Sequence, residues 1–254
     1  MAYTTIDNPE LYFQTKLYAG NGSNGHAITF DGSENMSPDW VWIKSRSSNS
    51  HRLTDSVRGA TKVLYSDLNF AEATDADTIQ SFDTNGFTID DDADTNGSGQ
   101  NFASWNWSAG GSAPAITYTV KVVSDSGNKY RFDDFGTSAV TLDLQEGGTY
   151  TFDQSDSSNS GHPLRFYTAS DKSGGEYTTG VTTTGTAGSS GAKTVITVAA
   201  SAPTLYYQCS NHAGMGGQAN TNSTFGSSNF GGSIQSTVSA NTTAGFSIVK
   251  YTGN

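Results

Sequence analysis

The sequence predicts an all-β protein, and three observations lead to that class. Short segments that alternate apolar and polar residues follow one another along the 254 residues, and none shows the 3.6-residue period of an amphipathic helix. The stretches between them are rich in Gly, Ser, Thr, Asn and Asp, with 29 Gly but only 5 Pro. Aromatic residues make up 11% of the chain and hydrophobic residues 34%, which fits short strands with aromatic cores and long polar loops.

The first 112 residues contain regularly spaced strand signals. Turns are expected at the Gly-rich residues 20–25 and at Thr-Asn-Gly, residues 84–86. Between such turns we expect strands at 12–19, 26–30, 39–44, 61–65, 78–85, 86–90 and 100–107, with 52–59 a loop or strand edge. Strands of this length and spacing predict an antiparallel sandwich.

Four tryptophans in this part admit two interpretations. Trp40 and Trp42 share one face of their strand, and Trp105 and Trp107 share one face of theirs. Large apolar residues at period 2 on central strands are more often core, and that is what we expect. If they were exposed, the four rings would instead offer a stacking platform for glycans.

Two polar clusters in the first 112 residues contain residue types found in metal or catalytic sites, but neither has the motif that such a site requires. The acidic run 90–97 has the oxygen ligands that calcium prefers, but it lacks EF-hand spacing. We therefore expect a solvated loop containing Asp90, Asp91, Asp92 and Asp94. His51 and Asp55 near Ser50 resemble triad members, yet no nucleophile elbow or oxyanion motif accompanies them. We expect no catalytic residues and no enzyme, although glycoside hydrolysis by acidic pairs stays open because their separation is spatial.

Residues 113–217 have a strand pattern of their own. Strands are expected at 118–124, 127–132, 140–144, 148–152, 163–167, 195–198 and 204–208. So many short strands in one segment predict a Greek-key sandwich. We therefore predict that 113–217 is a domain inserted into a surface loop of a first domain formed by 1–112 and 218–254, because surface loops tolerate insertions best.

The second domain ends in a cluster of metal-ligand residues. Cys209, His212 and Met215 supply a thiol, an imidazole and a thioether within seven residues, a set that suits copper better than calcium, magnesium or structural zinc. His162 lies upstream and would complete a set of two His, one Cys and one Met if the fold brings it close. The structural alternative is that Cys209 is a small buried hydrophobe and Met215 fills a gap in the core.

Charge and cysteine content exclude several classes. The net charge of −11 comes from 13 basic and 24 acidic residues, and such a surface repels phosphate backbones, so no nucleic-acid partner is expected. A single cysteine excludes an intrachain disulfide and leaves the redox compartment open. No apolar run approaches the ~20 residues of a bilayer span, and no signal-peptide pattern opens the chain. We therefore expect no membrane insertion.

Four motifs of the first domain resemble a module in structural proteins of marine tailed phages (cyanophage- or pelagiphage-like). They are DWVWIK at 39–44, DSVRGA at 55–60, FDTNGFT at 82–88 and ASWNWSAGG at 103–111. Those modules are similar to concanavalin A-like or laminin-G-like jelly rolls. In that family Ala-Gly-Gly is soon followed by a segment like 232–254, whereas here residues 112–231 intervene. This spacing supports the predicted insertion.

The phage resemblance implies a function. It implies a surface-exposed virion component, as a head decoration, fibre or tail-associated protein made in the host cytoplasm. Its partners would be other virion proteins, further copies of itself and host-surface glycans, bound through weak multivalent contacts. Residues 248–254 also resemble residues 15–21, so either the last strand pairs beside the first or a longer protein begins its next module here.

The second domain resembles cupredoxins. The shared features are a Gly-rich approach to a strand at 144–150, a His beside a sandwich strand and a late Tyr-Tyr-x-Cys loop. The resemblance makes His162, Cys209, His212 and Met215 the four type 1 copper positions, in a short Cys-x-x-His-x-x-Met variant. It implies a copper electron-transfer protein as the first alternative to the virion role, and a carbohydrate-binding module is the second. Copper is the cofactor this resemblance implies, and the virion role requires none.

Overall fold

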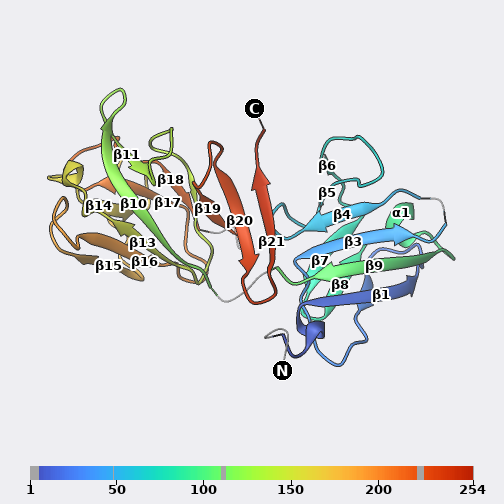
Figure 1. Cartoon of the computed structure of the whole chain (residues 1–254). Helices are drawn as coiled ribbons and strands as arrows, with labels where there is room; N and C mark the ends of the chain where they lie inside the picture. Colours follow the sequence, from blue (N-terminus) through green and yellow to red (C-terminus); the bar gives the residue numbers. More distant parts are fainter. Residues whose placement is uncertain (1–5, 48, 110–112, 222–225, 254) are drawn as a thin grey trace. The chain divides into compact units, whose positions relative to one another are not determined.

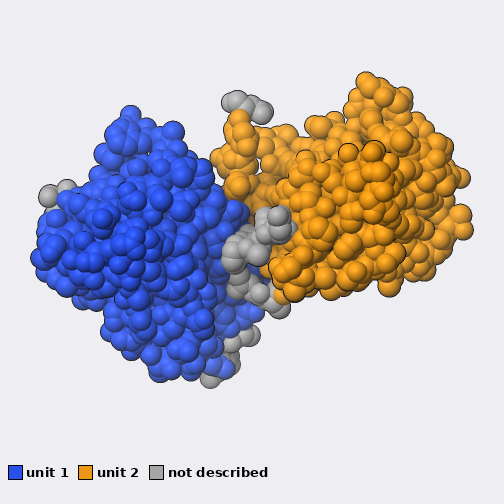
Figure 2. Space-filling view, turned by 180° about the vertical axis from the view of Figure 1, so that it is seen from behind, with its two compact units in different colours: residues 1–111, 239–248 blue, residues 112–238, 249–254 orange. Residues whose placement is uncertain are grey.

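The computed structural model describes residues 6–47, 49–109, 113–221 and 226–253 and shows a mostly-β protein. Strands dominate the described residues, and the single α-helix among them has four residues. The chain divides into two compact units, residues 1–111 with 239–248 (unit 1) and residues 112–238 with 249–254 (unit 2) (Figure 2). The predicted boundary at residue 112 lies outside the described residues, and the inserted domain 113–217 stays a prediction.

Unit 1 is built mainly from two antiparallel sheets (Figure 1). The first has the order β1-β9-β3-β4: Phe13–Ala19, Asn101–Trp107, Trp40–Ser45 and Arg52–Asp55. The second has the order β2-β8-β7: His26–Thr29, Gly86–Ile89 and Ile79–Asp83. Smaller elements are η1 (Pro9–Leu11), β5 (Lys62–Val63), β6 (Ala73–Thr74) and α1 (Ala93–Asn96).

The core of unit 1 takes side chains from both sheets. Val41 and Ile43 of β3 are fully buried in the same hydrophobic cluster as Phe87 and Ile89 of β8. Because strand side chains alternate between faces, the inward position of Val41 and Ile43 turns the neighbouring residues of β3 outward. The turn predicted at 84–86 is confirmed by the pairing of Asp83 with Gly86 in the β7–β8 hairpin.

Unit 2 contains a five-stranded and a four-stranded sheet. The first has the order β11-β10-β13-β16-β15: Asn128–Phe132, Ala115–Ser124, Thr149–Asp153, Lys193–Thr197 and Val181–Thr184. The second has the order β12-β18-β17-β14: Leu142–Asp143, Gln218–Asn220, Leu205–Cys209 and Leu164–Tyr167. The pairs β10–β13 and β12–β18 are parallel. A short helix, η2, spans Ser157–Asn159.

Both sheets of unit 2 contribute to one aromatic-rich core. Its fully buried tyrosines are Tyr118, Tyr130, Tyr150 and Tyr207. A buried hydroxyl is costly without a partner, and each of these four hydroxyls has one; the Tyr207 phenol, for example, donates to the Val140 carbonyl at 2.5 Å. Burial is also the main reason that the pKa of each of these phenols is raised, so these side chains are neutral hydrogen-bonding members of the core.

The last three strands form a separate sheet of order β19-β20-β21: Ser227–Asn229, Ser236–Asn241 and Phe246–Tyr251. The alternative that the last strand pairs beside the first is therefore wrong: β21 pairs with β20, whereas β1 pairs with β9. The turn between β20 and β21 explains why these two strands pair with each other. The Asn241 side chain accepts hydrogen bonds from the backbone N–H groups of Thr243 and Ala244, which closes a tight turn between β20 and β21.

The acidic run 90–97 is not the solvated loop that the sequence predicted. The Asp92 side chain accepts a 2.8 Å hydrogen bond from the Asp94 backbone N–H and caps α1. Asp94 forms an ion pair with Arg52, and the buried Asp90 accepts hydrogen bonds from the Asn24 and Gln80 side-chain amides. The Asp92 carboxylate serves the fold as a helix cap, since helix N-termini favour acidic caps, and those of Asp94 and Asp90 serve it through the ion pair and the amide hydrogen bonds.

Candidate metal centre

The pairing of β14 with β17 brings two predicted ligands to the same end of one sheet. The strands are antiparallel, and Leu164 lies opposite Cys209. His162 stands two residues before Leu164, and Cys209 is the last residue of β17. The Ser210 backbone N–H extends the pairing with a 3.0 Å hydrogen bond to the Pro163 carbonyl. Strand register therefore places the His162 imidazole beside the Cys209 sulfur.

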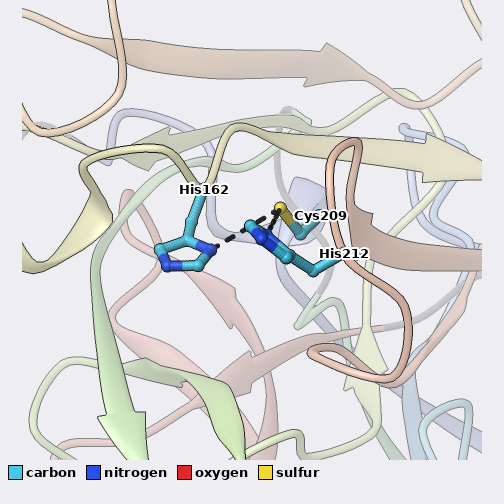
Figure 3. A group of neighbouring side chains, drawn as sticks. All are labelled: His162, Cys209 and His212. Atoms are coloured by element: carbon cyan, nitrogen blue, oxygen red, sulfur yellow. Dashed lines mark hydrogen bonds between the residues drawn. The ribbon is translucent and has the colours of Figure 1, made fainter.

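The structure brings His162, Cys209 and His212 together (Figure 3). The Cys209 Sγ lies 3.8 Å from Nδ1 of His162 and 3.5 Å from Nδ1 of His212. The centroids of the two imidazole rings are 4.7 Å apart. One ligand atom of each residue lies within 4.8 Å of those of the other two. The arrangement turns a nitrogen of each ring toward one sulfur, leaving all three donor atoms close to a common point.

Met215, the fourth predicted ligand, follows in the loop between β17 and β18. Its side chain is 2% exposed and belongs to the same hydrophobic cluster as Cys209. The Met215 carbonyl accepts a 2.8 Å hydrogen bond from the Tyr130 backbone N–H. The thioether therefore lies inside the core that surrounds the thiol.

Exposure increases across the three donors. Cys209 is fully buried, His162 is half-buried and His212 is exposed. Burial, and secondarily the neighbouring His212, lowers the pKa of His162. A lowered pKa favours the neutral imidazole, which is the form that binds metals. A buried thiol beside one half-buried and one exposed imidazole is a set of donors that suits a soft or borderline metal ion.

Contacts with two other segments hold the loop of residues 210–217, here called the ligand loop, which carries His212 and Met215. The Lys172 ammonium donates to the carbonyls of Cys209 and Ser210, at 3.1 and 3.2 Å. The Asn211 side chain donates to the Gly161 carbonyl at 2.9 Å and so links the loop to the segment that carries His162. The sequence did not point to Lys172, because it lies in a polar loop without a motif.

The four tryptophans lie on the outer face of the β1-β9-β3-β4 sheet. Trp40 pairs with Trp107 and Trp42 with Trp105 across β3 and β9, with ring centroids 4.7 and 5.3 Å apart. All four are half-buried and stand outside the buried cluster of unit 1. The expectation that they form the core is wrong, because the inward positions of β3 are taken by its aliphatic residues. Glycan contact by this aromatic face stays a prediction.

The triad-like residues have other partners. Nδ1 of His51 accepts a 3.2 Å hydrogen bond from the Trp42 indole and lies 3.0 Å from the Ser66 hydroxyl. Asp55 forms an ion pair with Arg58. These contacts serve the packing of unit 1.

Two β-sheet units, one of which gathers a thiol and two imidazoles, define a mostly-β protein with a candidate metal centre in its second unit. The chain belongs to the family defined by a domain of unknown function, DUF7483, whose model matches residues 8–130 and 218–254. No curated protein and no solved structure gave a significant match. The helices of the described residues are all too short to cross a membrane. All four predicted ligands lie between the two matched segments, so family membership assigns them no role.

Proposed function

We propose that unit 2 binds one copper ion through His162, Cys209 and His212, with Met215 as a weaker fourth ligand. The observation that carries this proposal is the approach of the three donor atoms to within 4.8 Å of one another. Two imidazoles, a thiolate and a weak thioether are the ligand set of blue-copper centres. The group contains no carboxylate, which disfavours calcium and magnesium.

The proposal treats residues 113–217 as a cupredoxin-like sandwich. Two sheets that share one core support it, with the predicted ligands at the end of β17 and in the loops beside it. Bound copper would supply one-electron transfer between its Cu(I) and Cu(II) states. The chain itself holds the Cys209 sulfur in an apolar cluster away from water and directs Nδ1 of His162 and His212 toward it. Such surroundings tune the potential of a copper–thiolate bond.

Replacing Cys209 with serine is the direct test. One equivalent of Cu(II) added to the reduced protein should give an intense visible thiolate-to-copper band, and Cys209→Ser should lose the band. The affinity for copper should fall roughly a hundredfold or more, since even outer-shell changes cost 10–100-fold. Absorption spectroscopy and competition titration measure both effects.

Two histidine variants complete this experiment. His212→Gln should weaken copper binding strongly, whereas the matched change His51→Gln in unit 1 should leave the band unaltered. A wild-type protein that stays colourless and takes up no copper, or a Cys209→Ser variant that keeps the band, contradicts the proposal. Preferential uptake of zinc would contradict the choice of metal.

We further propose that the protein is a surface-exposed virion component, such as a head decoration, fibre or tail-associated protein. The specific support is the group of phage-like motifs at 39–44, 55–60, 82–88 and 103–111. In this proposal residues 1–112 with 218–254 form a concanavalin-like jelly roll that contacts other virion proteins and copies of itself.

Immunogold labelling of intact phage particles tests the virion proposal. An antibody raised against this chain should label the head, tail or fibres, and pre-incubation with the purified protein should remove the label. Detection of the chain in lysates of infected cells without any label on purified particles would contradict it.

A further inference from the structure

Strand β11 contacts the segment that carries His162. The Tyr130 phenol donates a 2.8 Å hydrogen bond to the His162 carbonyl, which also accepts one from Gln154 at 2.9 Å. Two residues earlier, the Asn128 side-chain amide lies 3.5 Å from Nε2 of His162. This ring nitrogen is the one opposite the Nδ1 that faces the Cys209 sulfur. One strand therefore touches both the backbone and the outer ring edge of the ligand.

The same strand contacts the loop that carries the other ligands. The Tyr130 backbone N–H donates to the Met215 carbonyl at 2.8 Å, and the Lys129 ammonium donates to the Gly214 carbonyl. Strand β11 is the edge strand of its sheet, so its outer backbone groups are free of a neighbouring strand. The ligand loop occupies part of that edge.

We propose that Asn128, Lys129 and Tyr130, here called the β11 brace, are positioning residues of the metal centre. They tie the His162 segment to the loop of His212 and Met215 before any metal binds. The role of the brace in metal binding rests on the copper function proposed above.

The β11 brace would preorganise the two segments that carry the proposed ligands. The His162 and His212–Met215 segments are loops, and ordering a loop residue costs conformational free energy. If the brace orders these loops during folding, metal binding does not have to supply the free energy of ordering them, and the metal binds more tightly. The Tyr130 side chain is fully buried, which makes its hydrogen bond to His162 specific, since a buried phenol cannot exchange it for water.

The brace and the ligands come from different parts of the chain. Residues 128–130 are the last three of the first segment that the family model matches, whereas the ligands lie in the unmatched stretch that follows. The matched segment therefore contains the β11 brace but none of the proposed ligands.

Tyr130→Phe tests the brace with a close control. It removes one phenol hydroxyl and keeps the buried ring. The matched variant is Tyr118→Phe, because the Tyr118 phenol is equally buried and donates to the Ser228 carbonyl at 2.7 Å, away from the ligands. Copper affinity should fall about tenfold in Tyr130→Phe and the copper–thiolate band should shift, while Tyr118→Phe should keep the wild-type affinity and spectrum. Equal effects of the two variants on affinity and spectrum would overturn the proposal.

A second measurement needs no metal. The rate of iodoacetamide alkylation of Cys209 in the metal-free protein reports how well the ligand loop covers the thiol. Tyr130→Phe and Lys129→Met should raise this rate severalfold, whereas Tyr118→Phe and Lys121→Met should not; Lys121 pairs instead with Asp134. Unchanged rates in the brace variants would overturn the brace. If the wild type bound no copper but these rate differences appeared, the copper function would fail and the positioning of the loop would stand.

Discussion

Gly216→Ala is expected to disrupt the ligand loop and to lower the free energy of unfolding of unit 2 by about 3 kcal/mol. A Cβ at residue 216 would lie 1.6 Å from the carbonyl oxygen of Tyr207 and 2.7 Å from its carbonyl carbon. Both are backbone atoms of β17, which also carries Cys209. The Gly216 backbone N–H donates to the Gln208 side chain at 3.2 Å, so the loop cannot move away without losing this bond. Relief of the clash must displace either the loop or the strand.

Chemical denaturation and copper titration of the Gly216→Ala variant measure the two effects. Gly136→Ala is the control within unit 2, because a Cβ there has no atom within 4 Å and the change should stay within about 0.5 kcal/mol. Wild-type stability together with wild-type copper affinity in Gly216→Ala would show that the close approach to Tyr207 is absent.

Phe152→Ala is expected to destabilise unit 2 by about 3–5 kcal/mol. The ring is fully buried in the core of unit 2. Its centroid lies 5.4 Å from that of Phe166 and 5.6 Å from those of Phe132 and Tyr118, so its loss leaves a cavity between the two sheets. Copper uptake should be lost at the lower temperature at which unit 2 now unfolds. Calorimetry combined with copper titration measures this shift.

The matched change in the other core is Phe87→Ala. Phe87 is fully buried in the cluster of unit 1, so its removal should cost a comparable amount. Copper binding should nevertheless survive, because all four proposed ligands lie in unit 2. Loss of copper binding in Phe87→Ala at temperatures where Phe152→Ala retains it would contradict this assignment.

The sequence predicted those strands whose burial alternates. The strand expected at 39–44 was predicted because Val41 and Ile43 share one face and Trp40 and Trp42 the other, and it corresponds to β3. Strands β15, β18 and β19 were not predicted, because Val181–Thr184, Gln218–Asn220 and Ser227–Asn229 are short and mostly polar. Such segments become strands through pairing with neighbours rather than through their own apolar pattern. Helix α1 was not predicted either, because the acidic residues around it were expected to form a solvated loop.

The grouping of His162, Cys209 and His212 could be predicted from the sequence, but the contacts that hold these candidate ligands in place could not. Cys209 and His212 stand in one short motif, and His162 could be proposed from the small number of soft donors upstream. The contact of Tyr130 with His162 joins residues 32 positions apart, and nothing in the local sequence of β11 distinguishes it from any other edge strand. The outward position of the tryptophans was also not predictable, because both faces of β3 are apolar and only the packed structure decides which one is covered.

The pairing of Leu164 with Cys209 across β14 and β17 has a consequence for the folding of unit 2. A slip of one residue between β14 and β17 would turn Cys209 to the other face of the sheet, away from His162. We therefore expect only correctly registered chains to assemble the donor set, so that copper captures and stabilises them by mass action. The coloured complex would then form late in refolding. Its absorption would report the fraction of chains in which β14 and β17 have the correct register.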